Sequence, residues 1–233
     1  MSKQAYTELL ALLGIGGAHP GGLELTKDIL TEMDLNNKTV LEVGCGTGQT
    51  SAYLCSHGAK LTTIDNHPLM VEKANKRFLE RQLPCTALKM SIEETLLVPS
   101  TFDYVLAESV LTFTNIKKSI PEVYRLLKRN GSLICIEMTK KETLPKSLET
   151  KMKQVYGIPK ILTKEEWDKT FSSFGFREIN HNSIALSNIE PSEPELDPSH
   201  DIGEEYFSIL RKHEELTLET GSHIELSIIK AKK

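Results

Sequence analysis

Three glycines at alternate positions, Gly44, Gly46 and Gly48, lie in the most informative segment of the sequence, VLEVGCGTGQT. Because glycine lacks a Cβ atom, this segment can turn sharply and bring bare peptide groups close to a ligand. A short apolar run, Thr39 to Val43, precedes the glycines, and a helical pattern from Thr50 to His57 follows them. The free N–H groups at the start of that helix would point toward whatever occupies the turn. The sequence therefore predicts a small-molecule site at this strand-to-helix turn.

The glycine spacing discriminates between the ligand classes that use such a turn. Dinucleotide sites require G-x-G-x-x-G, which counted from Gly44 would place a glycine where Gln49 stands. A P-loop is excluded because no Gly-Lys-Ser/Thr follows. The spacing found is G-x-G-x-G, with Glu42 two residues upstream. An NAD-dependent oxidoreductase is therefore disfavoured and is kept only as an alternative.

An acidic residue closes the next short β-type run, LTTID, which ends at Asp65. This is about the separation at which an α/β site binds ribose. A carboxylate accepts hydrogen bonds from both ribose hydroxyls, which neutral side chains do poorly. The alternative is that Asp65 caps the helix predicted from Pro68 to Arg81. After the glycine loop, the ribose interpretation is the one we favour.

The first of these motifs resembles that of the class I S-adenosylmethionine-dependent methyltransferases. Glu42, Gly44, Gly46 and Gly48 match the family motif E-x-G-x-G-x-G, and the similarity extends from Lys38 to Met138. The resemblance implies S-adenosylmethionine as the cofactor. It also implies the fold of this family, a doubly wound and mostly parallel seven-stranded α/β sheet.

The resemblance also assigns contacts to the cofactor. The glycine loop, including Cys45 and Thr47, would hold its methionine end. Asp65 would bind the ribose hydroxyls, and Asn66 and His67 would lie beside the adenine. These assignments are carried over from the family, residue by residue.

The third stretch, MSIE, departs from the family pattern. Ser91 stands where many members carry an acid, ahead of the strand that starts at Phe102. We expect Ile92 to offer a backbone N–H and an apolar face to the adenine ring, and Glu93 to replace the missing carboxylate. The departure concerns the adenine contacts and leaves the class of cofactor unchanged.

Ligands in open α/β sheets bind beyond the carboxyl ends of the strands. This rule makes Glu108, Ser109 and Glu137 candidates for the methyl-acceptor side. Glu108 is predicted to act in catalysis or to hold the amino group of the cofactor. Glu137 has the alternative interpretation of an ordinary acid at the surface end of a strand.

The segment GGAHPGG around His19 is the second candidate element. Its glycines let the backbone approach a ligand, and histidine titrates near neutral pH. The segment is predicted to cover the cofactor, with His19 facing the acceptor and Tyr6 helping to close the cover. His19 and Glu108 are then the predicted catalytic residues. The alternative is a plain linker between two helices.

Short apolar strands alternate with helical stretches along the chain, the pattern of βαβ units in a sheet covered on both faces. The predicted strands cover residues 39–43, 60–64, 85–90, 102–107, 132–137, 176–182 and 223–229, and the predicted helices cover 3–13, 23–33, 50–57, 68–81, 120–127, 164–174 and 203–213. Residues 1–35 are expected to form a helical lid and residues 36–233 the methyltransferase domain. The acidic, proline-rich stretch at 188–201 predicts an exposed, mobile loop.

Composition narrows the choice of acceptor. The 233 residues carry a formal net charge of −4, which provides no large cationic field for nucleic acid or anionic lipid. No apolar run is long enough to cross a bilayer, and none resembles a secretory leader. The four cysteines form no C-x-x-C pair, which indicates reduced thiols in the cytoplasm and no metal site. The histidines other than His19 are scattered and mostly expected at the surface.

The sequence therefore predicts a cytoplasmic methyltransferase that acts on a small molecule, as a monomer or a homodimer. Two alternatives stay open within the same cofactor class. One is an RNA- or protein-directed methyltransferase, which would need a basic exposed groove. The other is a non-catalytic protein that binds S-adenosylmethionine.

Overall fold

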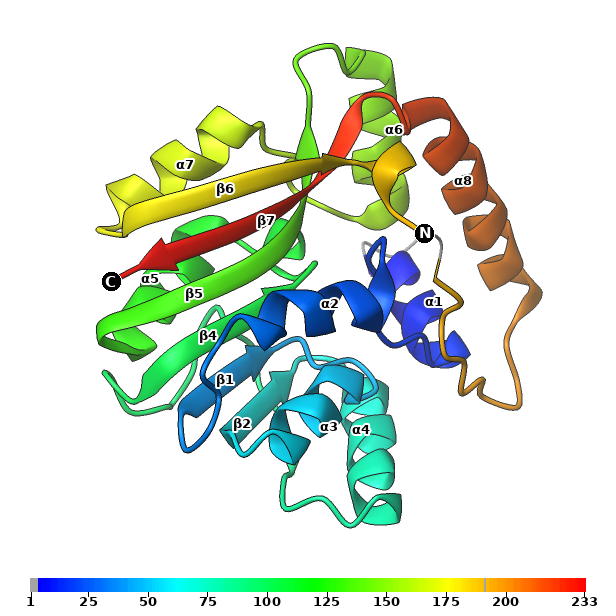
Figure 1. Ribbon diagram of the computed structural model, residues 1–233. Helices are drawn as coiled ribbons and strands as arrows, with labels where there is room; N and C mark the ends of the chain where they lie inside the picture. Colours follow the sequence, from blue (N-terminus) through cyan, green and yellow to red (C-terminus); the bar gives the residue numbers. More distant parts are fainter. Residues whose placement is uncertain (1–3, 191) are drawn as a thin grey trace.

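The computed structural model describes residues 4–190 and 192–233 and contains a seven-stranded sheet (Figure 1). The strands are β1 Thr39–Val43, β2 Lys60–Asp65, β3 Ala87–Lys89, β4 Phe102–Glu108, β5 Leu127–Lys140, β6 Arg177–Ala185 and β7 Ile224–Lys232. Their order across the sheet is β3-β2-β1-β4-β5-β7-β6. Strands β1 to β5 pair in parallel, and β7 is antiparallel to its neighbours β5 and β6. The predicted fold class is confirmed.

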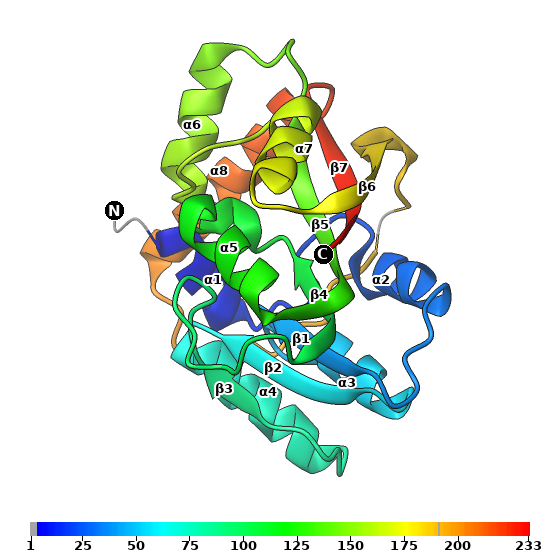
Figure 2. The same ribbon diagram turned by 90° about the vertical axis from the view of Figure 1, so that its left-hand side faces the viewer.

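Helices cover both faces of this sheet (Figure 2). They are α1 Ala5–Leu13, α2 Gly22–Thr31, α3 Gln49–Ser56, α4 Pro68–Glu80, α5 Ile116–Leu126, α6 Lys146–Tyr156, α7 Lys164–Ser173 and α8 Glu204–Thr220, with short 3-10 turns η1 Leu111–Phe113 and η2 Leu186–Asn188. Helices α5 and α7 pack on one face, and α2 and α3 pack on the other. This is the doubly wound arrangement.

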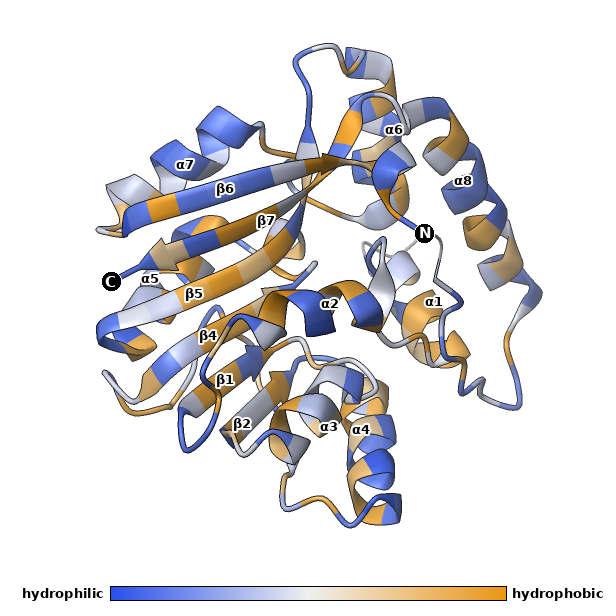
Figure 3. Cartoon of the chain, viewed as in Figure 1, coloured by the Kyte–Doolittle hydropathy of each residue, from blue (hydrophilic) through white to orange (hydrophobic). Residues whose placement is uncertain are grey.

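Strand β5 shows why the sequence folds this way. Leu133 and Cys135 point into the cluster under α5 and α7, whereas Ile134 and Ile136 point into the cluster under α2 and α3. A strand buried on both faces needs a continuous apolar run rather than an alternating one. Figure 3 shows β5 largely hydrophobic, while α7 and α8 carry hydrophilic residues along their length.

The largest differences from the predicted elements lie in the C-terminal half. Helix α6 is absent from the prediction, although Met152 and Tyr156 lie four residues apart on its buried side. Its lysine-rich remainder leaves only a narrow apolar stripe, a weak helical signal. Helix α8 continues beyond the predicted end at residue 213 because Leu216 and Thr220 are also buried.

Helices α1, α6 and α8 form a separate apolar cluster beyond the carboxyl ends of the parallel strands. Tyr6 and Leu9 of α1 pack there with Tyr156 of α6 and Ile209 of α8. The described part of the predicted lid therefore contacts the C-terminal helices. The division into a lid of residues 1–35 and a domain of residues 36–233 stays a prediction. The start of the first predicted helix, at Lys3, lies outside the described residues.

The stretch between η2 and α8 is mostly exposed, as predicted, yet it is fastened to the rest of the chain. We call its residues 192–201 the strap. The backbone N–H groups of Asp197 and Ser199 donate to the carbonyls of Leu13 and Leu12, at 3.2 and 2.7 Å. The strap thus runs beside the end of α1.

None of the described helices combines the length and the apolar character needed to cross a membrane.

Candidate functional site

A cavity of about 1020 Å³ opens at the carboxyl ends of β1 and β4, where the strand order reverses. This crevice is the usual ligand site of open α/β sheets. Its volume is at the upper end of the range for small-molecule sites, about 300–1000 Å³. The cavity is therefore large enough for a cofactor and a second small molecule.

The glycine loop forms one wall of this cavity, and its three glycines differ in what surrounds them. All three have positive φ, at 69° for Gly44, 53° for Gly46 and 78° for Gly48. A Cβ atom on Gly44 would collide with Val110, and one on Gly48 with Phe78. A Cβ atom on Gly46 would meet nothing within 4 Å. Gly44 and Gly48 are thus needed for packing, whereas Gly46 leaves a bare, open stretch of backbone facing the cavity.

Asp65 stands at the end of β2, opposite that open stretch. Its carboxylate accepts hydrogen bonds from the backbone N–H groups of Gly46 at 2.9 Å and His67 at 2.8 Å. Burial raises the pKa of Asp65, and these hydrogen bonds oppose the rise. The side chain is therefore held in place against the glycine loop, and it lines the cavity.

Glu42 lies deeper, within β1, and supports the loop from below. The side chain is almost completely buried and accepts hydrogen bonds from the hydroxyls of Ser51 and Thr63. Burial raises its pKa to about 8, so the group is mostly protonated at neutral pH. A neutral acid at this position tolerates the nearby Asp65 carboxylate at little electrostatic cost.

Most of the predicted cofactor residues meet at this cavity. Its lining includes Glu42, Gly44, Cys45, Gly46, Asp65, Asn66, Ser91, Ile92, Glu93 and Glu108. Two predicted residues do not line it, because Thr47 packs beside Gly16 and Gly48 faces Phe78. The buried ring nitrogen Nδ1 of His67 faces this region without a hydrogen-bond partner among the described residues.

His19 and Glu108 are 89 residues apart in the sequence, and the fold brings them into contact. His19 Nε2 lies 3.0 Å from Glu108 Oε2, and the hydroxyl of Thr26 donates to the same oxygen at 2.5 Å. His19 Nδ1 lies 3.0 Å from the carbonyl oxygen of Pro20. Burial lowers the pKa of His19, but the hydrogen bond and the charge of Glu108 outweigh it and raise the pKa overall. Both ring nitrogens face acceptors, which suits a protonated, cationic His19.

Glu137 is not the surface acid that its strand-end position suggested. It is fully buried and accepts hydrogen bonds from the backbone N–H groups of Val110, Leu111 and Thr112 at 3.2, 2.8 and 3.1 Å. The hydroxyl of Thr112 donates as well, at 2.6 Å. Burial raises the pKa of Glu137 to about 7. Its role is to fix the turn after β4, and that turn includes Ser109, which lines the cavity with a strained φ of 54°.

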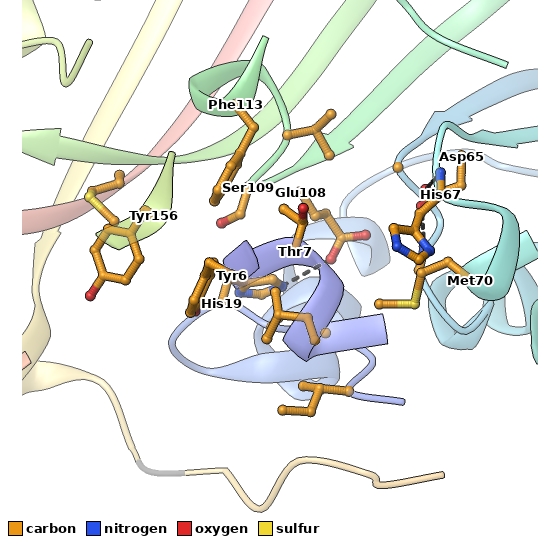
Figure 4. A pocket seen from close by; sticks show the side chains of 18 of the residues that line it. Tyr6, Thr7, His19, Asp65, His67, Met70, Glu108, Ser109, Phe113 and Tyr156 are labelled. Atoms are coloured by element: carbon orange, nitrogen blue, oxygen red, sulfur yellow. Dashed lines mark hydrogen bonds and ion pairs between the residues drawn. The ribbon is translucent and has the colours of Figure 1, made fainter. Parts of the chain in front are cut away.

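The second half of the cavity has an aromatic wall that the sequence patterns did not reveal. We call it the aromatic chamber, formed by Tyr6, Phe113, Met138, Met152, Tyr156 and His213. The rings of Tyr6 and Tyr156 meet edge to face with centroids 4.8 Å apart, and His213 lies 5.5 Å from Tyr6. Figure 4 shows the chamber rings on one side of His19 and Glu108, and Asp65 and His67 on the other.

The strap closes the cavity near the glycine loop. Arg77 of α4 bonds to Glu195 at 2.9 Å, and Gln49, next to the glycine loop, also bonds to Glu195. Lys73 of α4 contacts Asp197 in the same way. These contacts link regions more than a hundred residues apart, so no local pattern in the sequence could have indicated them.

Comparison with known proteins agrees with this geometry. A family model described as "Methyltransferase domain" matches residues 41–135, which span the glycine loop, Asp65 and Glu108. The uncharacterized methyltransferase YodH of Bacillus subtilis is 37% identical over 214 residues, covering 91% of each chain. The chain belongs to the class I S-adenosylmethionine-dependent methyltransferases. It is an enzyme of this family, and the NAD-dependent alternative is wrong.

Solved structures of this methyltransferase fold extend the similarity beyond the matched domain. Phosphoethanolamine N-methyltransferase 2 of Haemonchus contortus has a TM-score of 0.78 at 17% identity, covering 98% of this chain. This chain spans only 56% of that protein's length. Geranyl diphosphate C-methyltransferase of Streptomyces coelicolor has a TM-score of 0.72 at 11% identity, covering 90% of this chain and 78% of its own. At these identities the likeness is one of fold.

The residues at the cavity fit S-adenosylmethionine, the cofactor of this family. The open backbone at Gly46 can take a ligand in close contact, and the carboxylate of Asp65 stands beside it. The unpartnered Nδ1 of His67 offers a buried polar contact in the same half of the cavity. A bound ligand would satisfy that nitrogen, whose burial without a partner is otherwise costly.

Proposed function

We propose that this methyltransferase acts on a small molecule enclosed in the aromatic chamber. The observation that supports this proposal is that helices of this chain form the walls of the chamber. Tyr6 of α1, Tyr156 of α6 and His213 of α8 surround the space beyond Glu108. A folded RNA or protein would need an open groove instead.

An RNA- or protein-directed activity is the alternative, and one group of relatives suggests it. The ribosomal protein L11 methyltransferase of Helicobacter hepaticus is 29% identical over 137 residues, which is 57% of this chain. Within the described residues, however, no lysine or arginine lines the cavity. Nucleic-acid substrates depend on such side chains for contacts to phosphate. This observation counts against an RNA acceptor.

One half of the cavity is proposed to bind the cofactor and the other half the acceptor. In the cofactor half, Gly46 and Asp65 would hold the methionine and ribose parts, with Asn66, His67 and Ile92 around the adenine. When bound, the cofactor supplies a methyl group on a positively charged sulfur. The enzyme then has mainly to align the acceptor atom with that group.

Glu108 lies at the junction of the two halves and is the main catalytic candidate. Its Oε2 atom is taken by His19 and Thr26, which fixes the direction of the carboxylate. Its negative charge would stabilise the positive methionine end of the cofactor or orient a proton-bearing acceptor. His19 has both ring nitrogens engaged, so we assign it a positioning role: it attaches the N-terminal segment to the end of β4.

The proposal is tested with methyl-labelled S-adenosylmethionine and a cell extract divided by ultrafiltration into metabolites and macromolecules. We expect label to appear in the metabolite fraction and to disappear with the Asp65→Ala variant. Label that is instead removed from the macromolecules by nuclease or protease would overturn the small-molecule proposal. Binding of S-adenosylhomocysteine with no label in either fraction would also count against methyl transfer to a metabolite.

We also propose that the protein works in the cytoplasm. All four cysteines are free in the structure, which suits a reducing compartment such as the cytoplasm. A monomer or a homodimer is compatible with the enclosed cavity, because one chain supplies every wall described here.

A further inference from the structure

The aromatic chamber differs from the cofactor half of the cavity in its charge. The cofactor half contains the carboxyl groups of Asp65, Glu93 and Glu108, besides the buried and mostly protonated Glu42. In the chamber, the described lining has three kinds of titratable side chain: the phenols of Tyr6 and Tyr156, the imidazole of His213, and the carboxylate of Glu225. What charge these groups carry decides which acceptor can enter.

The phenols and the imidazole are held neutral. Burial, together with the nearby Tyr156, raises the pKa of Tyr6 above its usual range, and burial raises the pKa of Tyr156 to about 12. Burial lowers the pKa of His213. All three are therefore uncharged near pH 7, and the hydroxyl of Tyr156 lies 3.1 Å from His213 Nδ1, within hydrogen-bond distance.

The one acid of the chamber is neutralised by a partner outside it. Glu225 Oε1 lies 3.3 Å from Lys141 Nζ, and Lys141 does not line the cavity. No arginine or lysine of the described residues faces the chamber. The remaining wall is apolar, with Phe113, Met138 and Met152. An anionic group entering this space would lose its hydration and find no cation to replace it.

We propose that the acceptor is a molecule without an anionic group and with a flat, apolar body, and that Tyr6, Phe113 and Tyr156 select it by packing against that body. The proposal rests on the small-molecule function given above. It excludes acceptors that carry a phosphate or a carboxylate in the chamber. Polar recognition is limited to neutral hydrogen bonds, for which His213 on α8 is available at the wall.

The test uses two fluorescent probes that share one aromatic skeleton and differ by one charge: phenylnaphthylamine, which is neutral, and its sulfonated analogue, anilinonaphthalene sulfonate. Each is titrated into protein saturated with S-adenosylhomocysteine. We expect the neutral probe to bind at least about tenfold more tightly, because the sulfonate has no partner. We also expect Tyr156→Leu to weaken the neutral probe several-fold. Equal or tighter binding of the sulfonated probe to the wild type would overturn the proposal.

A second pair of variants keeps the proposal testable if Tyr156→Leu does not fold. Thr217 is exposed on α8 and lines the chamber, and its hydroxyl donates to the backbone carbonyl of His213 at 2.8 Å. Lysine and methionine are both good helix formers of similar length. We expect Thr217→Lys to raise affinity for the sulfonated probe about tenfold and Thr217→Met to leave it unchanged. No difference between the two would also overturn the proposal.

The failure of this proposal is separable from failure of the proposed function. Calorimetry with S-adenosylhomocysteine reports the cofactor half alone, and the labelling of metabolites against macromolecules reports the size of the acceptor. If both behave as expected and the sulfonated probe still binds as well as the neutral one, only the charge class of the acceptor is wrong.

Discussion

Two regions of this methyltransferase contain the same set of chemical groups, a histidine in contact with a carboxylate and a hydroxyl. In the first, His19 meets Glu108 and Thr26 at the edge of the cavity. In the second, His181 Nδ1 lies 2.7 Å from Asp168 Oδ1 and its Nε2 lies 2.7 Å from the hydroxyl of Ser227. By distances alone, the second region looks more like the triad of a hydrolase.

Access separates the two regions. Ser227 is completely buried, the side chain of His181 is 1% exposed, and neither lines the large cavity or the smaller one between α6 and α8. No substrate can reach that serine. The cluster instead ties α7 to β6, the next element in the chain, and to β7, which follows α8. A group of catalytic residue types therefore indicates chemistry only where a cavity reaches it.

The largest expected effect distinguishes the two carboxylates. Glu108→Ala should lower kcat/KM about 100-fold, because it removes a charge beside the reacting groups and the anchor of His19. Asp168→Ala is the matched control, and its activity per folded molecule should stay close to the wild type. The measurement is methyl transfer to the acceptor found in the labelling experiment. Comparable losses in both variants would remove the distinction drawn here.

The next effect concerns stability and belongs to the buried cluster of Asp168, His181 and Ser227. His181→Ala should lower the free energy of unfolding by about 2 kcal/mol, because the buried hydroxyl of Ser227 and the partly exposed carboxylate of Asp168 lose a hydrogen-bond partner. Activity per folded molecule should not change. Urea unfolding followed by circular dichroism measures the first quantity and an assay at low temperature the second. Reduced activity without reduced stability would contradict the structural role.

A smaller effect depends on pH and belongs to the cluster of His19, Thr26 and Glu108 at the edge of the cavity. The pKa of His19 is raised in the folded protein, chiefly by its hydrogen bond to Glu108 against the opposing effect of burial, with a further contribution from the charge of Glu137. A raised folded pKa means that the stability from this pair is fully present below the usual histidine pKa. It is lost as the pH rises through the folded value.

Urea unfolding at about pH 6 and about pH 9 tests this dependence. The wild type should lose more stability than His19→Gln over that interval, because glutamine does not titrate. If the wild type and the variant lose the same amount, the pair does not hold a proton in the folded state. The same variant should raise KM more than it lowers kcat, since His19 positions the N-terminal segment.

The smallest effect is expected at Ser227. Ser227→Ala should change the stability by no more than about 1 kcal/mol, because it removes one side of a hydrogen bond in a network that also contains Ser183, at 3.3 Å. The wild-type protein should not react with a fluorophosphonate, which labels activated serines. Labelling that is lost in the variant would show that Ser227 is reachable after all.

The sequence by itself determined the class of cofactor and the fold, and it predicted most of the residues that line the half of the cavity near β1 and β2. Gly44, Gly46 and Asp65 are fixed by short-range requirements: a positive φ, a close approach of backbone, and a carboxylate at the end of a strand. Each requirement leaves a residue type at a fixed place relative to a strand, so the sequence pattern indicates it even where the contact is with a distant residue such as Val110. The alternation of strands and helices gave the layers for the same reason.

The acceptor half was decided only by the tertiary structure. Tyr6, Phe113, Tyr156 and His213 come from four separate elements, and nothing in their local sequence marks them as neighbours. The burial of Glu137 and the attachment of the strap through Glu195 depend in the same way on long-range packing. A histidine and a carboxylate can form an active site only where a cavity lies beside them, and otherwise their contact is structural. Only the folded chain creates such a cavity.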